Sequence, residues 1–396
     1  MTARRIPEPA HEKRVSPARE KAPAIRWLWQ GREIFPAMHE AIAEAARSIR
    51  LETYIYTDGK VGRQMLAALT QAARRGVKVQ VLVDAIGSWF LPDAFFSPLL
   101  AAGGEFRRFN PLHPLRFGVR DHRKLLVCDE AISFLGGFNV ADEYAGDGVT
   151  AGWCDLGVRI ESAALAAKLA ASFSELFALA EFHDQAWRQF RAFRRRRTSR
   201  GERGSDLLLA RPGRGASPFQ SALYRQLKRA RCVQIVTPYF LPTLRLRREL
   251  VRVVRQGGRV QLVLAGKTDV PLSQLAARSL YRRLLKAGIE IYEYQPQILH
   301  AKLVRIDDVV FAGSSNFDIR SLNLNYELMF RMDDAATARG AEIIFARLLE
   351  HSRKIERHAW RQAQTFWGRW RHRWAHFLLT RIDPFVALFQ FRRLRR

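Results

Sequence analysis

Apolar and polar residues follow two alternating patterns along this chain, and the order of these patterns predicts its elements. Residues 36–49 have the spacing of an amphipathic helix, and residues 51–56 alternate as a strand. A second helix, 61–75, is followed by Gly76, where a left-handed cap is expected, and by the nearly continuous apolar strand 77–84. Helix, strand, helix and buried strand in succession predict an α/β fold.

The second half of the chain repeats this order. Residues 231–240 have the pattern of a strand, 244–256 that of a helix ending at Gly257 and Gly258, and 259–265 that of another strand. In each half a further helix and a short strand follow. The chain is therefore expected to contain two similar α/β domains.

The clearest repeated feature is a motif of His, any residue, Lys, four residues and Asp. Its two copies are His122, Lys124 and Asp129, and His300, Lys302 and Asp307. Each copy precedes a turn of small residues that ends in Asn, at 136–139 and at 313–316. The copies lie 178 residues apart (300 − 122), which indicates a domain duplication rather than a solenoid. Two such domains facing each other would build one site from two half-sites.

Composition limits the partners without choosing among them. At 396 residues and 48% hydrophobic content the chain is long enough for two cores, and its formal charge is +28. The electrostatic field of such a charge attracts polyanions, so nucleic acid, an anionic bilayer or a phosphorylated substrate are all possible partners. The three cysteines, Cys128, Cys154 and Cys232, have no paired spacing, which favours a reducing compartment without structural zinc.

The composition along the chain predicts five regions. These are a disordered leader at 1–24, a first domain at 25–190, a basic linker at 191–204, a second domain at 205–350 and a Trp- and Arg-rich tail at 351–396. The linker is either a solvated turn or a contact for anionic headgroups. By this pattern no apolar run approaches the roughly 20 residues of a spanning helix. Any membrane association is therefore expected to be peripheral.

The two motifs together suit displacement at a phosphodiester. Alternation in the strand after each Lys predicts that His and Lys share one face. An imidazole can attack phosphorus or carry a proton near neutral pH, whereas Lys and the amides of Asn139 and Asn316 can hold phosphate oxygens. The hydroxyl of Ser314 could also contact phosphate, while the first copy has Gly137 at that place.

Two other interpretations of the histidines are weaker. His122 and His300 could bind zinc, but the neighbouring lysines would oppose a divalent ion, and no carboxylate cluster with ligand spacing accompanies them. We therefore expect neither a metal nor another cofactor. A purely structural histidine is the usual case for a single residue, but it does not explain two matching copies.

The doubled motif resembles the phospholipase D superfamily. This resemblance implies two tandem α/β sandwich domains related by pseudo-two-fold symmetry, with each active histidine oriented by a carboxylate from the other domain. It implies that Asp155 pairs with His300 and Glu327 with His122, fixing the tautomer of each ring. Asp129 and Asp307 lie at strand ends before turns, so we assign them a structural role.

Further segments resemble bacterial cardiolipin synthases of the phospholipase D type, in a short subgroup without amino-terminal spanning helices. The more specific ones are G-G-F-N-V-A-D-E-Y at 136–144 and T-P-Y-F-L-P at 237–242. The resemblance implies that His122 attacks the phosphorus of phosphatidylglycerol or a similar donor while His300 protonates the leaving alcohol. A second phosphatidylglycerol would then convert the phosphohistidine to cardiolipin without a metal.

Rival functions remain open at this point. A phospholipase D hydrolase or a nuclease of the same superfamily would use the same motif, and an anionic-membrane binding protein without activity is a weaker alternative. We expect anionic phospholipid and the cytoplasmic face of a bacterial membrane as partners, rather than nucleic acid. One chain holds both half-sites, so a monomer suffices, and the oligomeric state stays open.

The tail is predicted to form an amphipathic helix that ends at Pro384. Its apolar face comprises Trp360, Trp367, Trp370, Trp374, Phe377 and Leu378. Arginines lie largely on the other faces. This segregation is typical of an interfacial anchor on anionic lipid, but also of a helix that packs its aromatic face on the protein body.

Overall fold

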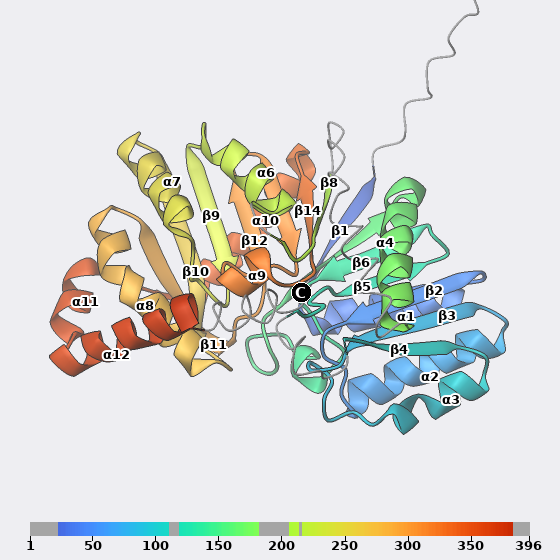
Figure 1. Ribbon diagram of the computed structural model, residues 1–396. Helices are drawn as coiled ribbons and strands as arrows, with labels where there is room; N and C mark the ends of the chain where they lie inside the picture. The colour runs from blue at the N-terminus through green and yellow to red at the C-terminus, as the bar shows by residue number, and fades with distance from the viewer. Residues whose placement is uncertain (1–22, 111–118, 182–205, 214–215, 383–396) are drawn as a thin grey trace, which may run out of the picture.

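The structure, a computed structural model, describes residues 23–110, 119–181, 206–213 and 216–382. Each half is built around one mixed β-sheet (Figure 1). The strands of the first sheet are β1 (Ala24–Trp29), β2 (Ser48–Thr53), β3 (Lys78–Asp84), β4 (Glu105–Phe109), β5 (Leu125–Cys128), β6 (Ile132–Gly136) and β7 (Leu156–Glu161). Those of the second are β8 (Asp206–Ala210), β9 (Cys232–Thr237), β10 (Arg259–Lys267), β11 (Glu290–Ile298), β12 (Leu303–Ile306), β13 (Val309–Gly313), β14 (Glu327–Met332) and β15 (Ser352–Lys354).

The two sheets have the same strand order. The first runs β1-β7-β6-β5-β2-β3-β4, and the second runs β8-β14-β13-β12-β9-β10-β11 with β15 added at its edge. In both, the strand after the His motif pairs antiparallel with the first strand of a parallel trio, β5 with β2 and β12 with β9. The predicted duplication of one α/β domain is thereby confirmed.

Helices cover both faces of each sheet. In the first half they are α1 (Gly31–Glu44), α2 (Lys60–Arg74), α3 (Ser97–Ala101) and α4 (Ala163–Glu181). In the second half they are α6 (Pro218–Leu227), α7 (Leu244–Arg255), α8 (Pro271–Lys286), α9 (Ile319–Asn323) and α10 (Ala335–Glu350). Helices α4 and α10 belong to one core shared by both halves, in which Phe173 and Phe345 lie with Val127 and Phe330. The halves are thus joined by a continuous apolar interior.

Two predicted boundaries were displaced. Helix α1 begins at Gly31 instead of residue 36, with the exposed Pro36 inside it, because Ile34 and Phe35 already face the core. Strand β2 ends at Thr53 instead of residue 56. The alternation continues past its end because Tyr56 forms an isolated bridge with Val140. The capping glycines Gly76 and Gly257 have φ of 88° and 84°, as predicted.

The expectation that no apolar run approaches the length of a membrane span was wrong for α4. Residues 163–180 form an 18-residue stretch with a mean hydropathy of 1.5, the one described helix long and apolar enough for a span by length and composition. Lys168 and Glu175 interrupt it, which hides it in the sequence. Its buried residues, including Leu169 and Phe173, lie in the shared core, so we assign α4 to the protein interior.

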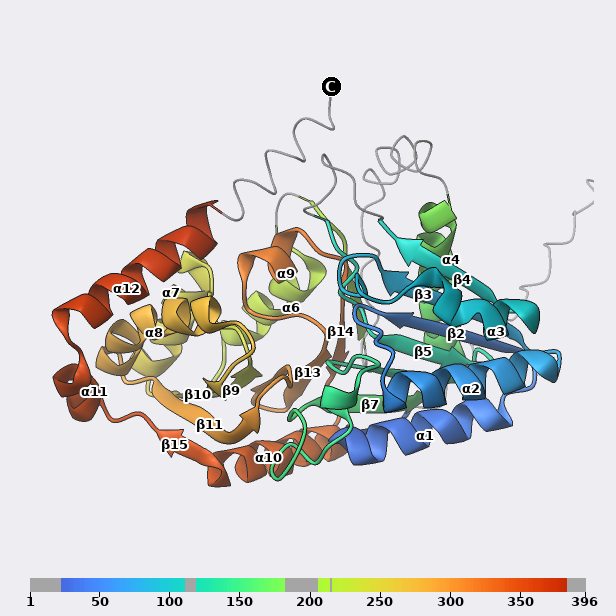
Figure 2. The same ribbon diagram turned by 90° about the horizontal axis from the view of Figure 1, so that it is seen from below.

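The tail forms two helices instead of the single one predicted. Helix α11 (Arg357–Ala363) and helix α12 (Phe366–Phe377) are separated at Thr365, whose hydroxyl accepts the Gly368 N–H at 3.0 Å and caps α12. Figures 1 and 2 both show α12 lying across α8, with α10 elsewhere on the second half. A short turn, η3 (Leu378–Ile382), follows α12.

Three predictions fall outside the described residues. The leader at 1–24 does so except for its last two residues, and Ala24 already begins β1. The linker at 191–204 and the stop at Pro384 are the others.

Candidate active site

The two His motifs meet where the halves cross. The backbone N–H of His122 donates to the carbonyl of Tyr326 at 3.0 Å, and that of His300 donates to the carbonyl of Cys154 at 2.7 Å. In each case the motif of one half bonds to the residue just before the carboxylate of the other half. The backbone therefore fixes each histidine beside a carboxylate from the opposite domain.

Each imidazole contacts the carboxylate that the resemblance implied. His300 Nδ1 lies 2.7 Å from Asp155 Oδ2, and His122 Nδ1 lies 3.1 Å from both Glu327 Oε1 and Oε2. Both carboxylates are fully buried, at 1% exposure. An ionised carboxylate on Nδ1 holds the proton there, which leaves Nε2 as the ring nitrogen without a proton. Nε2 of His300 lies 3.0 Å from Lys302 Nζ. This pairing across the domain interface is confirmed by the geometry.

The two carboxylates are supported differently. The Ser314 hydroxyl donates to Glu327 Oε2 at 2.5 Å and accepts the N–H of Leu328 at 3.0 Å. The sequence predicted a phosphate contact for this hydroxyl, but the structure gives it a carboxylate partner instead. Gly137 takes the equivalent place beside Asp155, since its N–H donates to the Leu156 carbonyl at 3.2 Å, as the Ser314 N–H donates to the Leu328 carbonyl at 2.9 Å.

The exchange of Ser for Gly matches the exchange of Glu for Asp. A Cβ added to Gly137 would lie 2.3 Å from Asp155 Oδ1, which is far inside the contact distance of carbon and oxygen. The first half thus needs a glycine at this turn, so that the short side chain of Asp155 can place its carboxylate against the backbone. The second half has a longer carboxylate and a hydroxyl to hold it.

The two lysines lie behind the histidines. Lys124 Nζ donates to the backbone carbonyl of His122 at 2.8 Å, and Lys302 Nζ does so to that of His300 at 2.5 Å. The Lys302 Nζ also lies 2.8 Å from Nδ1 of the His300 ring. Burial lowers the pKa of Lys124 to about 7 and that of Lys302 to about 8. An incoming phosphate anion would favour the protonated form of both.

The pKa values of the ionisable groups around the lysines are shifted in different directions. Burial and then Lys124 lower the pKa of His122 well below its usual value, and burial and then Lys302 lower that of His300 to about 4. Burial raises the pKa of Glu327 to about 8. Burial also acts to raise the pKa of Asp155, but His300 and Lys302 outweigh it and lower that pKa. Without substrate, both imidazoles are therefore neutral near pH 7.

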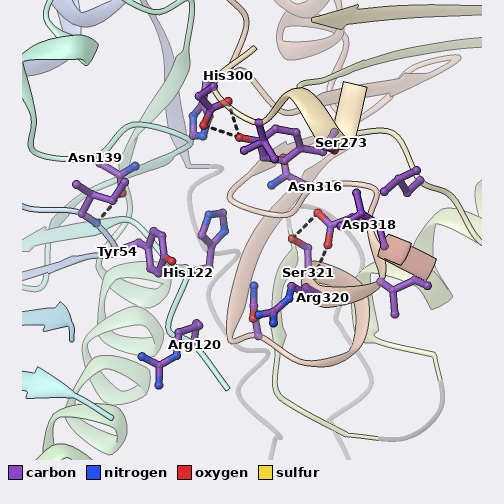
Figure 3. A pocket seen from close by; sticks show the side chains of 18 of the residues that line it. Tyr54, Arg120, His122, Asn139, Ser273, His300, Asn316, Asp318, Arg320 and Ser321 are labelled. Atoms are coloured by element: carbon purple, nitrogen blue, oxygen red, sulfur yellow. Dashed lines mark hydrogen bonds between the residues drawn. The ribbon is translucent and has the colours of Figure 1, made fainter. Parts of the chain in front are cut away.

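A pocket of about 360 Å³ opens between the halves in front of both histidines. Figure 3 shows the side chains that surround it. Its polar lining includes Tyr54, Arg120, His122, Asn139, Ser273, His300, Asn316, Asp318, Arg320 and Ser321. Both halves contribute to this lining, so the pocket exists only at their interface.

The two asparagines predicted to bind phosphate both line this pocket. Asn139 Oδ1 accepts the N–H of Ile55 at 3.0 Å, and its amide donates to the Tyr144 hydroxyl at 2.7 Å. Asn316 Oδ1 is buried and has no hydrogen-bond partner among the described residues. This oxygen can accept a hydrogen bond from a hydroxyl of a ligand, whereas a contact with phosphate oxygens would have to come from the amide N–H groups of Asn316.

Several lining residues were not predicted as site residues. The ring of Tyr54 meets that of His122 edge to face at 5.0 Å, and Tyr144 and Trp153 lie 5.3 Å and 5.4 Å from the His300 ring. Arg120, two positions before His122, is held by Asp84 at 3.2 Å. Tyr144 lies in the segment 136–144 that carried the resemblance, which was the available signal.

The Asp residues of the motifs lie at the far ends of their strands. Asp129 accepts the backbone N–H groups of residues 46–48 at 2.7 to 2.8 Å, and Asp307 accepts those of Arg231 and Cys232. Both have positive φ, 54° and 51°, and begin the turn of a hairpin. The second turn is one residue shorter, as the sequence predicted. This geometry fits a structural role, because the contacts tie the hairpin to the strand beside it.

Among the described residues no group of three or more His, Cys, Asp or Glu could hold a metal ion. The charged residues that line the pocket are Arg120, Arg320, Asp269 and Asp318, whereas Lys124 and Lys302 lie behind the histidines, outside that lining. The arrangement thus offers two oriented imidazoles, with an ammonium group behind each, to an anion in the pocket.

The sequence matches a family model described as "Cardiolipin synthase, PLD-like domain" over residues 38–177 and 223–349, which include both motifs and both carboxylates. The chain belongs to this family. Cardiolipin synthase B of Escherichia coli (strain K12) is 35% identical over 311 residues, covering 76% of this chain and 75% of that protein. Cardiolipin synthase 1 of Bacillus cereus is 32% identical over 345 residues, covering 83% and 67%.

The fold of this cardiolipin synthase family member is shared with a more distant solved structure. The phosphatidylserine synthase of Haemophilus influenzae Rd KW20 superposes with a TM-score of 0.73 at 14% identity, over 92% of this chain and 95% of that one. At that identity the likeness shows the fold. Together with the family membership and the close relatives, it identifies an enzyme of the phosphatidyltransferase type.

Proposed function

We propose that the protein makes cardiolipin by moving a phosphatidyl group from one phosphatidylglycerol to another, through a phosphohistidine and without a metal. The observation that carries this proposal is the pair of imidazoles in one pocket. Each is held at Nδ1 by a buried carboxylate, at 3.1 Å and 2.7 Å, and we assign its other ring nitrogen, Nε2, to the substrate. At His300 this requires Lys302 Nζ, now 3.0 Å from Nε2, to turn to the phosphate. Two such groups allow one to bond to phosphorus while the other moves a proton.

In the first step His122 reacts in the form whose Nδ1 proton is held by ionised Glu327, so its Nε2 attacks phosphorus and the bond from phosphorus to the headgroup glycerol oxygen breaks. The phosphate anion raises the pKa of His300, which then takes up a proton from solvent at Nε2, and the leaving oxygen accepts that proton. We assign the attack to His122 because its side chain is 13% exposed while that of His300 is 6% exposed. Lys124, Lys302 and Asn316 stabilise the non-bridging oxygens as charge builds on them.

In the second step the glycerol hydroxyl of another phosphatidylglycerol replaces the released glycerol. His300, now neutral, accepts its proton, and the oxygen attacks phosphorus. The bond from phosphorus to His122 breaks, which yields cardiolipin and restores both histidines. A diester replaces a diester, so the exchange needs neither a nucleotide nor an energy source.

We further propose that the enzyme lies peripherally on the cytoplasmic face of a bacterial membrane, held there by α12. Trp360 packs on Tyr281 at 4.9 Å between ring centroids, so it belongs to the protein body. The other aromatic residues of the predicted face are exposed: Trp367 70%, Trp370 49%, Trp374 46% and Phe377 53%. An exposed aromatic face beside arginines is typical of a helix at an anionic interface.

Lipid analysis tests the catalytic proposal. Purified enzyme in mixed micelles with phosphatidylglycerol and EDTA is expected to produce cardiolipin and glycerol in equal amounts, measured by mass spectrometry and enzymatic glycerol assay. The matched control is the double variant His122→Ala, His300→Ala, checked for folding by circular dichroism. Phosphatidic acid as the main product would indicate a hydrolase instead, and dependence on a divalent ion would contradict the metal-free mechanism.

Sedimentation with anionic vesicles tests the anchor. The triple variant Trp367→Ser, Trp370→Ser, Trp374→Ser is expected to lose most vesicle binding but keep its turnover in detergent. Trp360→Ser is the contrasting variant, because this side chain packs on the body and its loss should lower stability more than vesicle binding. Unchanged sedimentation of the triple variant would contradict the anchor.

A further inference from the structure

A second cavity, of about 670 Å³, lies outside the active site between α7, α8 and the two tail helices. Of its fourteen lining residues eight are Arg or Lys and two are His, and none of these described residues is acidic. Arg278 is neutralised, since it binds the buried Glu293 through two bonds of 2.9 and 3.1 Å. The other Arg and Lys side chains make the lining of this cavity strongly positive.

Two buried atoms of this cavity lack partners. Arg247 Nε and His376 Nδ1 make no hydrogen bond to any described part of the chain. Burial, and then the like charge of Arg283, lowers the pKa of Arg247, and burial followed by Arg247 lowers that of His376. Crowding cations without acids and leaving buried polar groups unpaired opposes folding. Such an arrangement is explained if an anion supplies the missing charge and the missing acceptors.

An apolar groove continues from the cavity. The groove, of about 340 Å³, runs between α7 and α8 and shares Arg247, Leu280 and Arg283 with the cavity. Its apolar walls are Leu244, Val251, Leu280 and Leu284, and its other five lining residues are arginines, Arg247, Arg248, Arg252, Arg255 and Arg283. Leu244 is 63% exposed at its edge. A cluster of cations that opens into an apolar groove matches the two parts of a phospholipid, a phosphate headgroup and acyl chains.

The cavity also shares α12 with the proposed membrane contact. Arg369, His372, Arg373 and His376, spaced as one helical face, line the cavity. The exposed tryptophans occupy another face of the same helix, and Ala375 is buried beside α8. Both figures of the whole molecule show α12 lying along α8 (Figures 1 and 2). A lipid in the bilayer under α12 would therefore meet the cations directly.

We propose that this cavity binds the phosphate headgroup of a second anionic phospholipid, which is not consumed, with its acyl chains along the groove between α7 and α8. The proposal goes beyond the catalytic one and uses none of its residues. The bound headgroup bridges arginines of α8 to arginines of α12. The turn after α12 brings Leu379 into the wall of the active-site pocket, so the lipid steadies one wall of that pocket.

Vesicle binding of the full chain tests the site. The probe is phosphatidylcholine vesicles with a minor fraction of phosphatidate, which has no headgroup alcohol to expel and so cannot act as donor. Arg247→Gln, Arg283→Gln is expected to weaken binding by roughly tenfold, near the loss of one to two phosphate contacts. The matched control, Arg357→Gln, Arg371→Gln, removes the same charge from exposed positions on α11 and α12 outside the cavity and should change binding less. Equal losses in the two variants would overturn the proposal in favour of a general surface attraction.

Soluble ligands separate a built site from a charged surface. Short-chain phosphatidate below its micelle concentration is expected to raise the Tm of the wild-type chain with saturation at one site, and inorganic phosphate to do so more weakly. Equal effects of inorganic phosphate, or binding of a single-stranded oligonucleotide without binding of the lipid, would reject a lipid site. Without ligand, the Arg247→Gln, Arg283→Gln variant should have a higher Tm than wild type, because like-charge repulsion is removed. Should it not fold, Arg369→Gln, Arg373→Gln serves as the pocket variant.

Discussion

The two half-sites contain the same types of residue in different settings. His300 lies in the closed half, 2.7 Å from its carboxylate and against the rings of both Tyr144 and Trp153. His122 lies in the open half, at 3.1 Å from both oxygens of Glu327, with Tyr54 against its ring. Duplication produced two half-sites of the same design, and the structural differences between them suit the two histidines to different roles in the reaction.

The carboxylates sharpen this difference. Asp155 stays ionised because His300 and Lys302 outweigh its burial and lower its pKa. Glu327 has its pKa raised to about 8 by burial, so it is largely protonated at neutral pH. An ionised acceptor stabilises a protonated ring, which suits the closed half to carry a proton. A neutral ring with a weaker partner suits the open half to attack phosphorus.

The largest expected effect is the separation of the two histidines. His122→Ala and His300→Ala should each lower turnover of phosphatidylglycerol by about 10³-fold or more. With a phosphatidyl p-nitrophenol donor, whose leaving group needs no proton, His300→Ala should still release nitrophenolate in a burst and carry a phosphatidyl label on His122. His122→Ala should do neither. A label on His300 would reverse the assignment.

The next effect concerns the carboxylates. Asp155→Asn should lower kcat/KM by about 100-fold and Glu327→Gln by about tenfold, because only the first removes a charge that is present near pH 7. Both substitutions keep the shape of the side chain, so circular dichroism and Tm should change little. Equal losses would show that the two halves do not differ in the way that their electrostatics indicate.

A smaller effect is expected at the turns. Gly137→Ala should reduce activity by about tenfold, because its Cβ would push the Asp155 carboxylate out of its position beside His300. Ser314→Ala should reduce it by about threefold, the loss of one hydrogen bond to a largely protonated partner. The pair is compared by kcat/KM at pH 7. A larger loss for Ser314→Ala would place the more demanding turn in the open half.

The smallest effect is that of pH. Lys124 and Lys302, with pKa values of about 7 and 8, are protonated below those values and lose their charge as pH rises through them. Because phosphate needs the charged forms, kcat/KM should fall severalfold as pH rises through this window. Glu327 ionises in the same window and favours an orientation of His122, so Glu327→Gln should make the fall steeper. A profile that rises between pH 7 and 9 would contradict this role of the lysines.

The sequence predicted the parts of the molecule that depend on local pattern and repetition. The strands after Lys124 and Lys302 were recognisable as apolar runs, and the 178-residue period implied the matching sheets. The pairing of Asp155 with His300 came from the resemblance instead, because nothing in the spacing of the residues shows which strands cross. The pattern therefore predicted where the strands lie, whereas the contact between Asp155 and His300 was predicted only through the resemblance.

Other features depend on tertiary packing and could not be predicted. The partner of the Ser314 hydroxyl is set by how the turn meets β14, which hydrophobic periodicity does not encode. The stripe from Trp360 to Phe377 continues through the break at Thr365, so periodicity alone gave one helix and one face. Likewise, Arg247 and Arg369 lie far apart in sequence, and only the docking of α12 on α8 brings them to one cavity.

The backbone bridges between the halves also decide which parts of the chain a complete half-site needs. His122 lies more than 200 positions before Glu327, its carboxylate partner, and its N–H is held by Tyr326. A chain that is still leaving the ribosome, or a fragment cut between the halves, therefore holds a histidine without its carboxylate. Each histidine–carboxylate pair is complete only when both halves are present.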